Sequence, residues 1–136
     1  MDRLFLDANV LFTAAHNPQG KAAFLFDVLS LRRWRLVSSN YAVEEARRNI
    51  NIKYPQCAPR LAELLQQLDI VPQPTVQQIP IELPDKDQPI YLAARSAHST
   101  HLLTGDLRHF GPHMNQPEKS EGIVIQTVAE FLDDSG

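Results

Sequence analysis

The stretch Arg3-Leu4-Phe5-Leu6-Asp7 decides the fold class, because a short apolar run ends abruptly at a carboxylate. The run is too short for a helix and is typical of a strand that is buried on both faces. The stretch His101-Leu102-Leu103-Thr104-Gly105-Asp106 repeats this pattern near the other end of the chain. In an open parallel sheet the carboxyl ends of the strands share one edge, and ligands bind at that edge. The two stretches therefore predict a parallel sheet that carries acids at one edge.

The rest of the chain alternates between predicted strands and helices. Besides 3–6 and 101–104, strands are predicted at 36–38, 69–71 and 123–125. Helices are predicted over about 21–31, after Ser38 or Ser39 through Ile50, over 61–68, from Pro89 to about His98, and over 128–132. A turn at 17–20, a proline-rich extended connector at 72–84 and a polar loop at 107–122 complete the chain. We expect a single domain over 1–136, an α/β fold built as a three-layer α/β/α sandwich with a central parallel sheet of about five strands.

The composition is that of an ordinary folded domain. Of the 136 residues, 43% are apolar and 21% are charged, which leaves enough apolar chain to bury a core. The single cysteine, Cys57, excludes an internal disulfide and argues against a cysteine-based metal site. No stretch has the length of a membrane span, and the N-terminus does not read as a leader. We therefore expect a cytoplasmic protein that does not bind membranes.

The net charge of -3, from 13 basic and 16 acidic residues, argues by itself against a nucleic-acid binder. The sum is misleading if several acids are gathered around a metal ion that neutralises them. The remaining basic residues include Arg32, Arg33 and Arg35 around Trp34, and Arg47, Arg48 and Lys53 further on. This distribution permits RNA binding without predicting it.

Asp7 and Asp106 are the strongest candidates for a functional site, because each lies where a predicted buried strand ends. Carboxylates brought together from distant parts of a chain repel one another unless a cation lies between them. The pattern therefore favours a divalent-metal site that cleaves phosphodiesters. Each acid also has a structural interpretation: Asp7, like Asn9, could cap the segment that follows, and Asp106 could cap a turn at 107–110. Thr104 could bond a neighbouring acid or be an ordinary strand residue.

Two adjacent acids, Glu44 and Glu45, lie on one predicted helix. Glu44 precedes Arg48 by one helical turn, which is typical of an exposed ion pair. Glu45 lies nearer the flank of the apolar face of the same helix. Glu45 is therefore the favoured site residue, and Glu44 remains the alternative.

Asp85 and Asp87 precede the helix that begins near Pro89. Either residue could cap this helix, where a carboxylate also interacts favourably with the helix dipole. We favour Asp87 because it lies next to the helix start, and we keep Asp85 as a supporting candidate. The oxygen ligands of such a site suit Mg²⁺ or Mn²⁺.

The histidines give a weaker signal than the acids. His98, His101, His109 and His113 have no acid or cysteine at zinc-motif spacing, so we expect ordinary surface residues. The chain also has no dinucleotide-binding glycine motif, no phosphate-binding loop and no serine nucleophile elbow. Nucleotide-dependent redox chemistry, ATP hydrolysis and serine hydrolysis therefore have no support in the sequence.

Four motifs together resemble a PIN domain. They are Asp7-Ala8-Asn9-Val10-Leu11-Phe12, Val43-Glu44-Glu45-Ala46, Asp87-Gln88-Pro89-Ile90-Tyr91-Leu92-Ala93-Ala94 and Leu103-Thr104-Gly105-Asp106-Leu107-Arg108-His109-Phe110-Gly111. The first and last are the more specific, and the order and spacing match over nearly the whole chain. The resemblance implies an α/β/α sandwich with a Mg²⁺ or Mn²⁺ site. Its ligands would be Asp7, Asp87 and Asp106, with Glu45 a further ligand or an anchor for water, and Asn9 supporting the first acid.

The resemblance also implies a function. Many small PIN domains are VapC-like toxins of type II toxin–antitoxin modules, which are endoribonucleases held inactive by an antitoxin. Others process RNA, and some have lost activity. We therefore expect a metal-dependent endoribonuclease with RNA as substrate, an antitoxin as partner and a homodimer as assembly. Such an enzyme would leave a 5′-phosphate and a 3′-hydroxyl, with Arg47, Arg48 or the loop around Arg108 holding the RNA backbone.

Three alternatives belong to other classes. The first is an inactive PIN-like module that only binds a partner, and the second is an RNA-processing nuclease without an antitoxin. The third is a phosphatase-like hydrolase with an aspartate nucleophile. Such an enzyme would carry a second aspartate two residues after the first, and Asn9 at this position argues against it.

Overall fold

The computed structural model describes residues 1–135 and places five parallel strands in one sheet. The strands are β1 (Asp2–Leu6), β2 (Trp34–Ser39), β3 (Asp69–Val71), β4 (His101–Leu103) and β5 (Val124–Gln126). Their order across the sheet is β3-β2-β1-β4-β5. β1 is the central strand, and Leu4, Phe5 and Leu6 are completely buried, as the unbroken apolar run predicts. The predicted fold class is confirmed.

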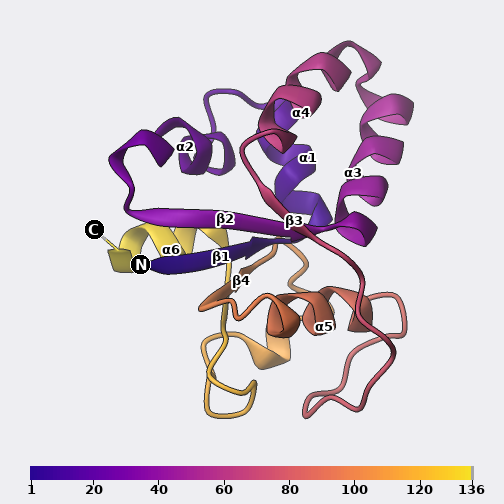
Figure 1. Ribbon diagram of the computed structural model, residues 1–136, viewed down its shortest axis with the longest axis vertical. Coiled ribbons are helices and arrows are strands. Elements are labelled where there is room, and N and C mark those ends of the chain that lie inside the picture. The colour runs from indigo at the N-terminus through magenta and orange to yellow at the C-terminus, as the bar shows by residue number, and fades with distance from the viewer. Residues whose placement is uncertain (136) are drawn as a thin grey trace.

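Helices cover both faces of this sheet. They are α1 (Ala8–His16), α2 (Lys21–Asp27), α3 (Asn40–Lys53), α4 (Ala58–Leu65), α5 (Gln88–Ser96) and α6 (Val128–Ser135). α1, α2 and α4 lie on one side of the sheet and α5 lies on the other (Figure 1). The chain runs outward from β1 to β3 and then crosses back to β4 and β5. Right-handed crossovers in these two opposite directions place their helices on opposite faces, which gives the three layers.

The sequence prediction was wrong at two points near the N-terminus. It placed no helix between Asp7 and the turn at 17–20, where the structure has α1. Val10, Leu11, Ala14 and Ala15 of this helix are buried at helical spacing, so the pattern was present in the sequence.

The helix predicted over 21–31 is also shorter than expected, because α2 ends at Asp27 and a short 3₁₀ turn, Leu29–Leu31, follows it. Arg32 then adopts a left-handed conformation with φ of 56°. This conformation ends the helical segment and turns the chain into β2.

Other predicted elements are confirmed with small shifts of their ends. β2 begins at Trp34, whose indole nitrogen donates a hydrogen bond to the Leu25 carbonyl at 3.1 Å. Its ring packs edge-on against Phe131 of α6, with 5.3 Å between ring centroids. Residues 72–84 contain neither helix nor strand, as their prolines predict. None of the described helices combines the length and the apolar character needed to cross a membrane.

The strand order defines where a site can form. β1 and β4 are neighbours in the sheet. From β1 the chain continues to β2 and β3 on one side, and it then crosses over to β4 on the other side of β1. In such sheets the loops after the two strands diverge and leave a crevice at their carboxyl ends. Asp7 follows β1 directly, and Thr104 follows β4 directly. The fold therefore brings the two most prominent acidic stretches of the sequence to one crevice.

Candidate active site

Asp7 ends β1 and begins α1. It is 4% exposed, and its Oδ1 accepts a hydrogen bond from the Ala8 amide at 2.7 Å. Its Oδ2 accepts one from the Thr104 hydroxyl at 2.8 Å and another from Asn9 Nδ2 at 3.2 Å. The same residue is therefore the N-cap of α1 and the buried acid at the strand end.

Thr104 connects Asp7 to Asp106. Its hydroxyl donates to Asp7 and accepts a hydrogen bond from the Asp106 amide at 3.0 Å. Asn9 joins the same network, because its Oδ1 accepts a hydrogen bond from the Gly105 amide at 2.7 Å and its Nδ2 lies 3.3 Å from Thr104 Oγ1. These bonds hold the end of β4 against the end of β1. Asn9 and Thr104, both predicted as supporting residues, therefore fix the relative positions of the two acids.

One cavity of about 370 Å³ at this edge is lined by acids from four separate segments. They are Asp7 after β1, Glu45 in the middle of α3, Asp87 before α5 and Asp106 after β4. These are the four acids that the sequence favours as site residues. A larger cavity of about 630 Å³ lies beside His109 and includes one carboxylate, Glu82. We assign the chemistry to the smaller cavity because the acids gather there.

The alternative acids lie outside this cavity. Glu44 is exposed and pairs with Arg47, not with Arg48 as the sequence predicted, because the i,i+3 contact brings the two charges together. Asp85 is exposed and is not among the residues that line the cavity. Asp87, in contrast, is 8% exposed and occupies the N-cap position of α5 without making a capping hydrogen bond. The capping interpretation therefore does not describe Asp87.

The acids raise one another's affinity for protons. Burial, the largest cause, and the charges of Glu45 and Asp87 raise the pKa of Asp7 from 3.8 to about 6, although hydrogen bonds from Thr104 and Ala8 oppose this. Burial and the charge of Asp106 raise the pKa of Asp87, and His109 opposes that change. The cavity therefore concentrates negative charge that its own hydrogen bonds only partly offset.

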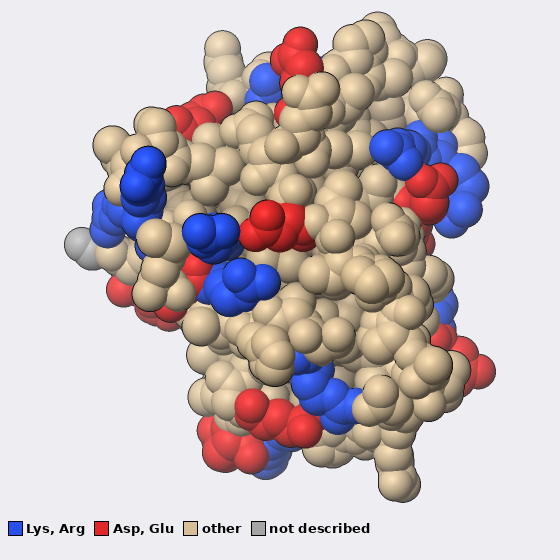
Figure 2. All heavy atoms as spheres, viewed as in Figure 1, with Lys and Arg blue, Asp and Glu red and all other residues tan. Residues whose placement is uncertain are grey.

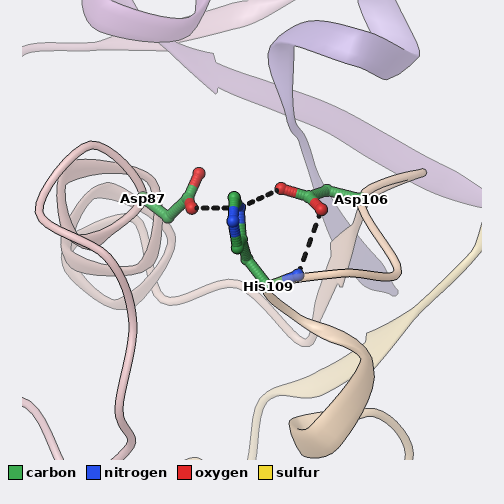
Figure 3. A group of neighbouring side chains, drawn as sticks. All are labelled: Asp87, Asp106 and His109. Carbon is green, nitrogen blue, oxygen red and sulfur yellow. Dashed lines mark hydrogen bonds and ion pairs between the residues drawn. The ribbon is translucent and has the colours of Figure 1, made fainter.

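His109 lies between two acids of the candidate site, which the sequence did not predict. Its Nδ1 lies 2.9 Å from Asp106 Oδ2 and 2.9 Å from Asp87 Oδ2, and the ring stands between the two carboxylates (Figure 3). Its side chain is 22% exposed, so the prediction of an ordinary surface residue was wrong. The spacing of Asp106 and His109, one turn apart, was the available signal. The contact with Asp87 joins residues far apart in sequence and had no local signature.

The basic residues near the acids differ from those that the sequence suggested. Lys53 and Lys86 line the cavity, whereas Arg47 and Arg48 do not, and Arg108 lines the larger cavity. Glu45, Asn49 and Lys53 follow one another at intervals of four residues, so a single face of α3 supplies all three. On the face shown in Figure 2, basic and acidic side chains lie in small mixed groups.

Comparison with known proteins agrees with this geometry. The family model of the PIN domain matches residues 3–108, which include all four acids. This chain belongs to the PIN-domain family. The resemblance inferred from the four motifs is thereby confirmed. A search of curated proteins found no match.

Solved structures similar to this PIN domain share its fold at low sequence identity. VapBC2 from Rickettsia felis, solved bound to a promoter DNA fragment, has a TM-score of 0.65 and 13% identity, covering 92% of this chain and 98% of that one. VapC20 of Mycobacterium tuberculosis, described as a toxin that cleaves the sarcin–ricin loop, has a TM-score of 0.58 and 12% identity, covering 81% and 94%. VapBC-1 from nontypeable Haemophilus influenzae has a TM-score of 0.56 and 15% identity, covering 93% and 98%.

The raised pKa of Asp7 predicts how the stability of the metal-free PIN domain depends on pH. Folded Asp7 keeps its proton up to about pH 6, whereas unfolded Asp7 loses it near 3.8, so its contribution to the free energy of unfolding falls as pH rises between these values. Asp7→Asn keeps an oxygen for the Ala8 amide and removes the titration. We expect the variant to gain about 2 kcal/mol relative to wild type between pH 4.5 and 7.5, measured by urea unfolding in EDTA.

The exposed acid Asp85 provides a control for this experiment. Asp85→Asn removes an acid of the same type that lies outside the cavity. It should follow the wild-type dependence of stability on pH. A difference between Asp7→Asn and wild type that stays constant over this range would show that Asp7 acts only as a helix cap.

Proposed function

We propose that this PIN domain is a metal-dependent endoribonuclease that hydrolyses RNA phosphodiester bonds, and that it is the toxin of a toxin–antitoxin module. The observation that carries the proposal is the convergence of Asp7, Glu45, Asp87 and Asp106 on one cavity. Carboxylates that line one cavity repel one another when ionised, and a bound cation would balance their charge. A divalent ion bound by carboxylates is suited to hold and polarise a phosphodiester.

The donor atoms of the cavity fit a divalent metal ion. All four acids offer carboxylate oxygens, the donors that Mg²⁺ and Mn²⁺ accept. Asp87 Oδ2 is buried; His109 Nδ1 lies 2.9 Å from it but makes its hydrogen bond to Asp106, so Asp87 Oδ2 keeps an unused lone pair within the cluster. When bound, such an ion neutralises the acids, lowers the pKa of water and stabilises the charge that develops on the phosphate.

Each residue of the site would then have its own role. Asp7 and Asp87 are the most buried of the four acids and would anchor the ion, with Asp106 completing the set. Glu45 is half-buried on α3 at the same cavity, where it would orient the water that attacks phosphorus. Thr104 and Asn9 donate hydrogen bonds to Oδ2 of Asp7 and would hold its carboxylate in place at the cavity. We expect products with a 5′-phosphate and a 3′-hydroxyl.

Aromatic rings beside the cavity support single-stranded RNA as the substrate. Phe12 lines the cavity, and its ring centroid lies 4.9 Å from that of His16 and 5.7 Å from that of Tyr54. His16 and Tyr54 are stacked at 4.7 Å, and Tyr54 is 37% exposed. Proteins bind single strands by stacking unpaired bases on such rings and by holding phosphates with basic side chains. Lys53 and Lys86 would serve the second purpose here.

The toxin assignment rests on the resemblance to VapC-like proteins and on structural similarity to the toxin VapC20 and to the VapBC structures. VapC-like toxins are held inactive by an antitoxin, so we propose such a partner for this chain as well. We also retain the homodimer as a prediction. Purification with the partner present would mask nuclease activity, and this governs how activity must be tested.

Cleavage of a mixed RNA pool tests the proposed activity. Purified protein should cut RNA with Mn²⁺ or Mg²⁺ and stop in EDTA. Asp7→Asn should lower the rate at least about 100-fold, because the loss of one metal ligand removes several kcal/mol of transition-state stabilisation. Asp85→Asn should retain wild-type activity. Absence of cutting by protein that is folded and free of co-purified inhibitor would instead support the inactive binding module.

The position of Lys53 gives a second prediction, on substrate binding. Lys53→Ala should raise the KM for a short single-stranded RNA and lower the slope of log KM against log salt by about 0.7, because one phosphate contact is lost. The kcat should change little, since Lys53 is not one of the residues proposed to bind the metal ion. Arg47→Ala is the matched control, because Arg47 lies on the same helix but pairs with Glu44 outside the cavity. Equal effects of both variants on KM would contradict a specific phosphate contact at Lys53, because the loss of positive charge on α3 would then be enough to explain them.

A further inference from the structure

The contacts of His109 leave one carboxylate oxygen without a hydrogen bond. Nδ1 of His109 is 2.9 Å from Asp106 Oδ2 in hydrogen-bonding geometry, and it is equally close to Asp87 Oδ2. A ring nitrogen carries one proton or one lone pair, so it cannot satisfy both oxygens. When the Nδ1 proton is given to Asp106, Asp87 Oδ2 is buried without a hydrogen bond from any other described residue. His109 Nδ1, Asp106 Oδ2 and Asp87 Oδ2 therefore lie close together with one hydrogen bond too few among them.

The spacing of these three atoms allows them to bind one metal ion. Asp87, Asp106 and His109 each offer a ligand atom, and all three atoms lie within 4.8 Å of one another. Adjacent ligands of a six-coordinate ion with bonds of about 2.1 Å lie about 3.0 Å apart. The two distances of 2.9 Å from Nδ1 match this value. A metal ion would take the lone pairs of all three atoms, including the one that nothing else uses.

The loop after β4 holds His109 in this position. The His109 amide donates a hydrogen bond to Asp106 Oδ1 at 3.1 Å, which turns Oδ2 of the same carboxylate toward the imidazole. Phe110, the next residue, is completely buried, and its amide bonds the Asp106 carbonyl at 3.1 Å. Neighbouring backbone bonds and core packing thus preorganise the imidazole beside both acids.

We propose that His109 is a direct nitrogen ligand of the metal site, together with Asp87 and Asp106, and that it makes the site select Mn²⁺ over Mg²⁺. This inference rests on the proposed function, because it concerns the same metal site. Mg²⁺ takes oxygen ligands almost exclusively, whereas an imidazole nitrogen suits first-row transition metals. An all-carboxylate site would have no such preference built into its ligands.

In a competing account, a protonated His109 takes the place of the metal ion and leaves the site when metal binds. The imidazole borders the cavity of about 630 Å³, which gives it room to turn away when an ion binds. The two accounts predict opposite effects of removing the imidazole. A ligand that is lost weakens metal binding, whereas a competing cation that is lost strengthens it.

Metal binding to the purified full chain distinguishes these accounts without relying on activity. We would measure Mn²⁺ affinity by electron paramagnetic resonance of the free ion, and Mg²⁺ affinity by competition. His109→Gln should weaken Mn²⁺ binding at least about tenfold while changing Mg²⁺ binding by less than about threefold. His113→Gln is the matched control, because His113 Nε2 lies 2.7 Å from the Glu82 carbonyl and outside the acid cluster. It should bind both ions as wild type does.

A spectroscopic measurement on the wild-type protein avoids dependence on the fold of any variant. Pulsed electron paramagnetic resonance of bound Mn²⁺ should show coupling to a histidine nitrogen, which changes when the protein is labelled with ¹⁵N-histidine. Bound Mn²⁺ without nitrogen coupling, or tighter Mn²⁺ binding by His109→Gln, would overturn the proposal and leave the nuclease assignment standing. Wild-type protein that binds neither ion would overturn this proposal and the metal dependence of the proposed function together.

Discussion

The hydrogen bond from Thr104 to Asp7 joins the ends of two adjacent parallel strands, and the geometry of the site depends on it. β1 and β4 are distant in sequence. Pairing of their backbones alone would not fix the positions of the side chains that follow the two strands. Thr104 binds Asp7 through its hydroxyl and accepts the Asp106 amide through the same oxygen. A single buried oxygen therefore links the two acids, and Asn9 and the hydrogen bond from the Asp7 amide to the Leu103 carbonyl support the same junction. Loss of the hydroxyl would leave Asp7 under-bonded within the sheet edge, which is costly for a buried carboxylate.

The acids show that a helix cap can also belong to the acid cluster. Asp7 caps α1 and at the same time belongs to the acid cluster, and Asp106 accepts the His109 amide while its other oxygen faces the imidazole. Asp87 is the exception, since it occupies a cap position without capping. The positive ends of the dipoles of α1 and α5 lie at these residues and favour negative charge there. Helix starts thus offset part of the repulsion that the cluster generates.

Local patterns in the sequence were enough to predict the sheet and the acids. The run Leu4 to Leu6 predicts a strand buried on both faces, and in a parallel sheet the position of Asp7 follows from it. The structure places Glu45 and Asp87 in the cavity, as helix phase and proximity to a helix start suggested. α1 was not predicted, although Asp7 is its N-cap and its apolar residues have helical spacing. The contact of His109 with Asp87 could not be predicted in the same way, because it joins two elements that only the folded chain brings together.

The net charge is also explained by the site. Four of the 16 acidic residues line one cavity, and without them the 13 basic residues would exceed the remaining acids by one. The acidic total therefore reflects the cluster and says little about the surface that a polyanion would meet. Some remaining charges are paired far from the cavity, as Arg95 is with Glu121 and Arg35 is with Asp69. Lys53 and Lys86 instead lie at the cavity itself, where an RNA phosphate would have to approach the acids. If the proposed metal ion binds, it and the two lysines would together attract a polyanion to one point of an acidic protein, because charges at one cavity are little screened by salt.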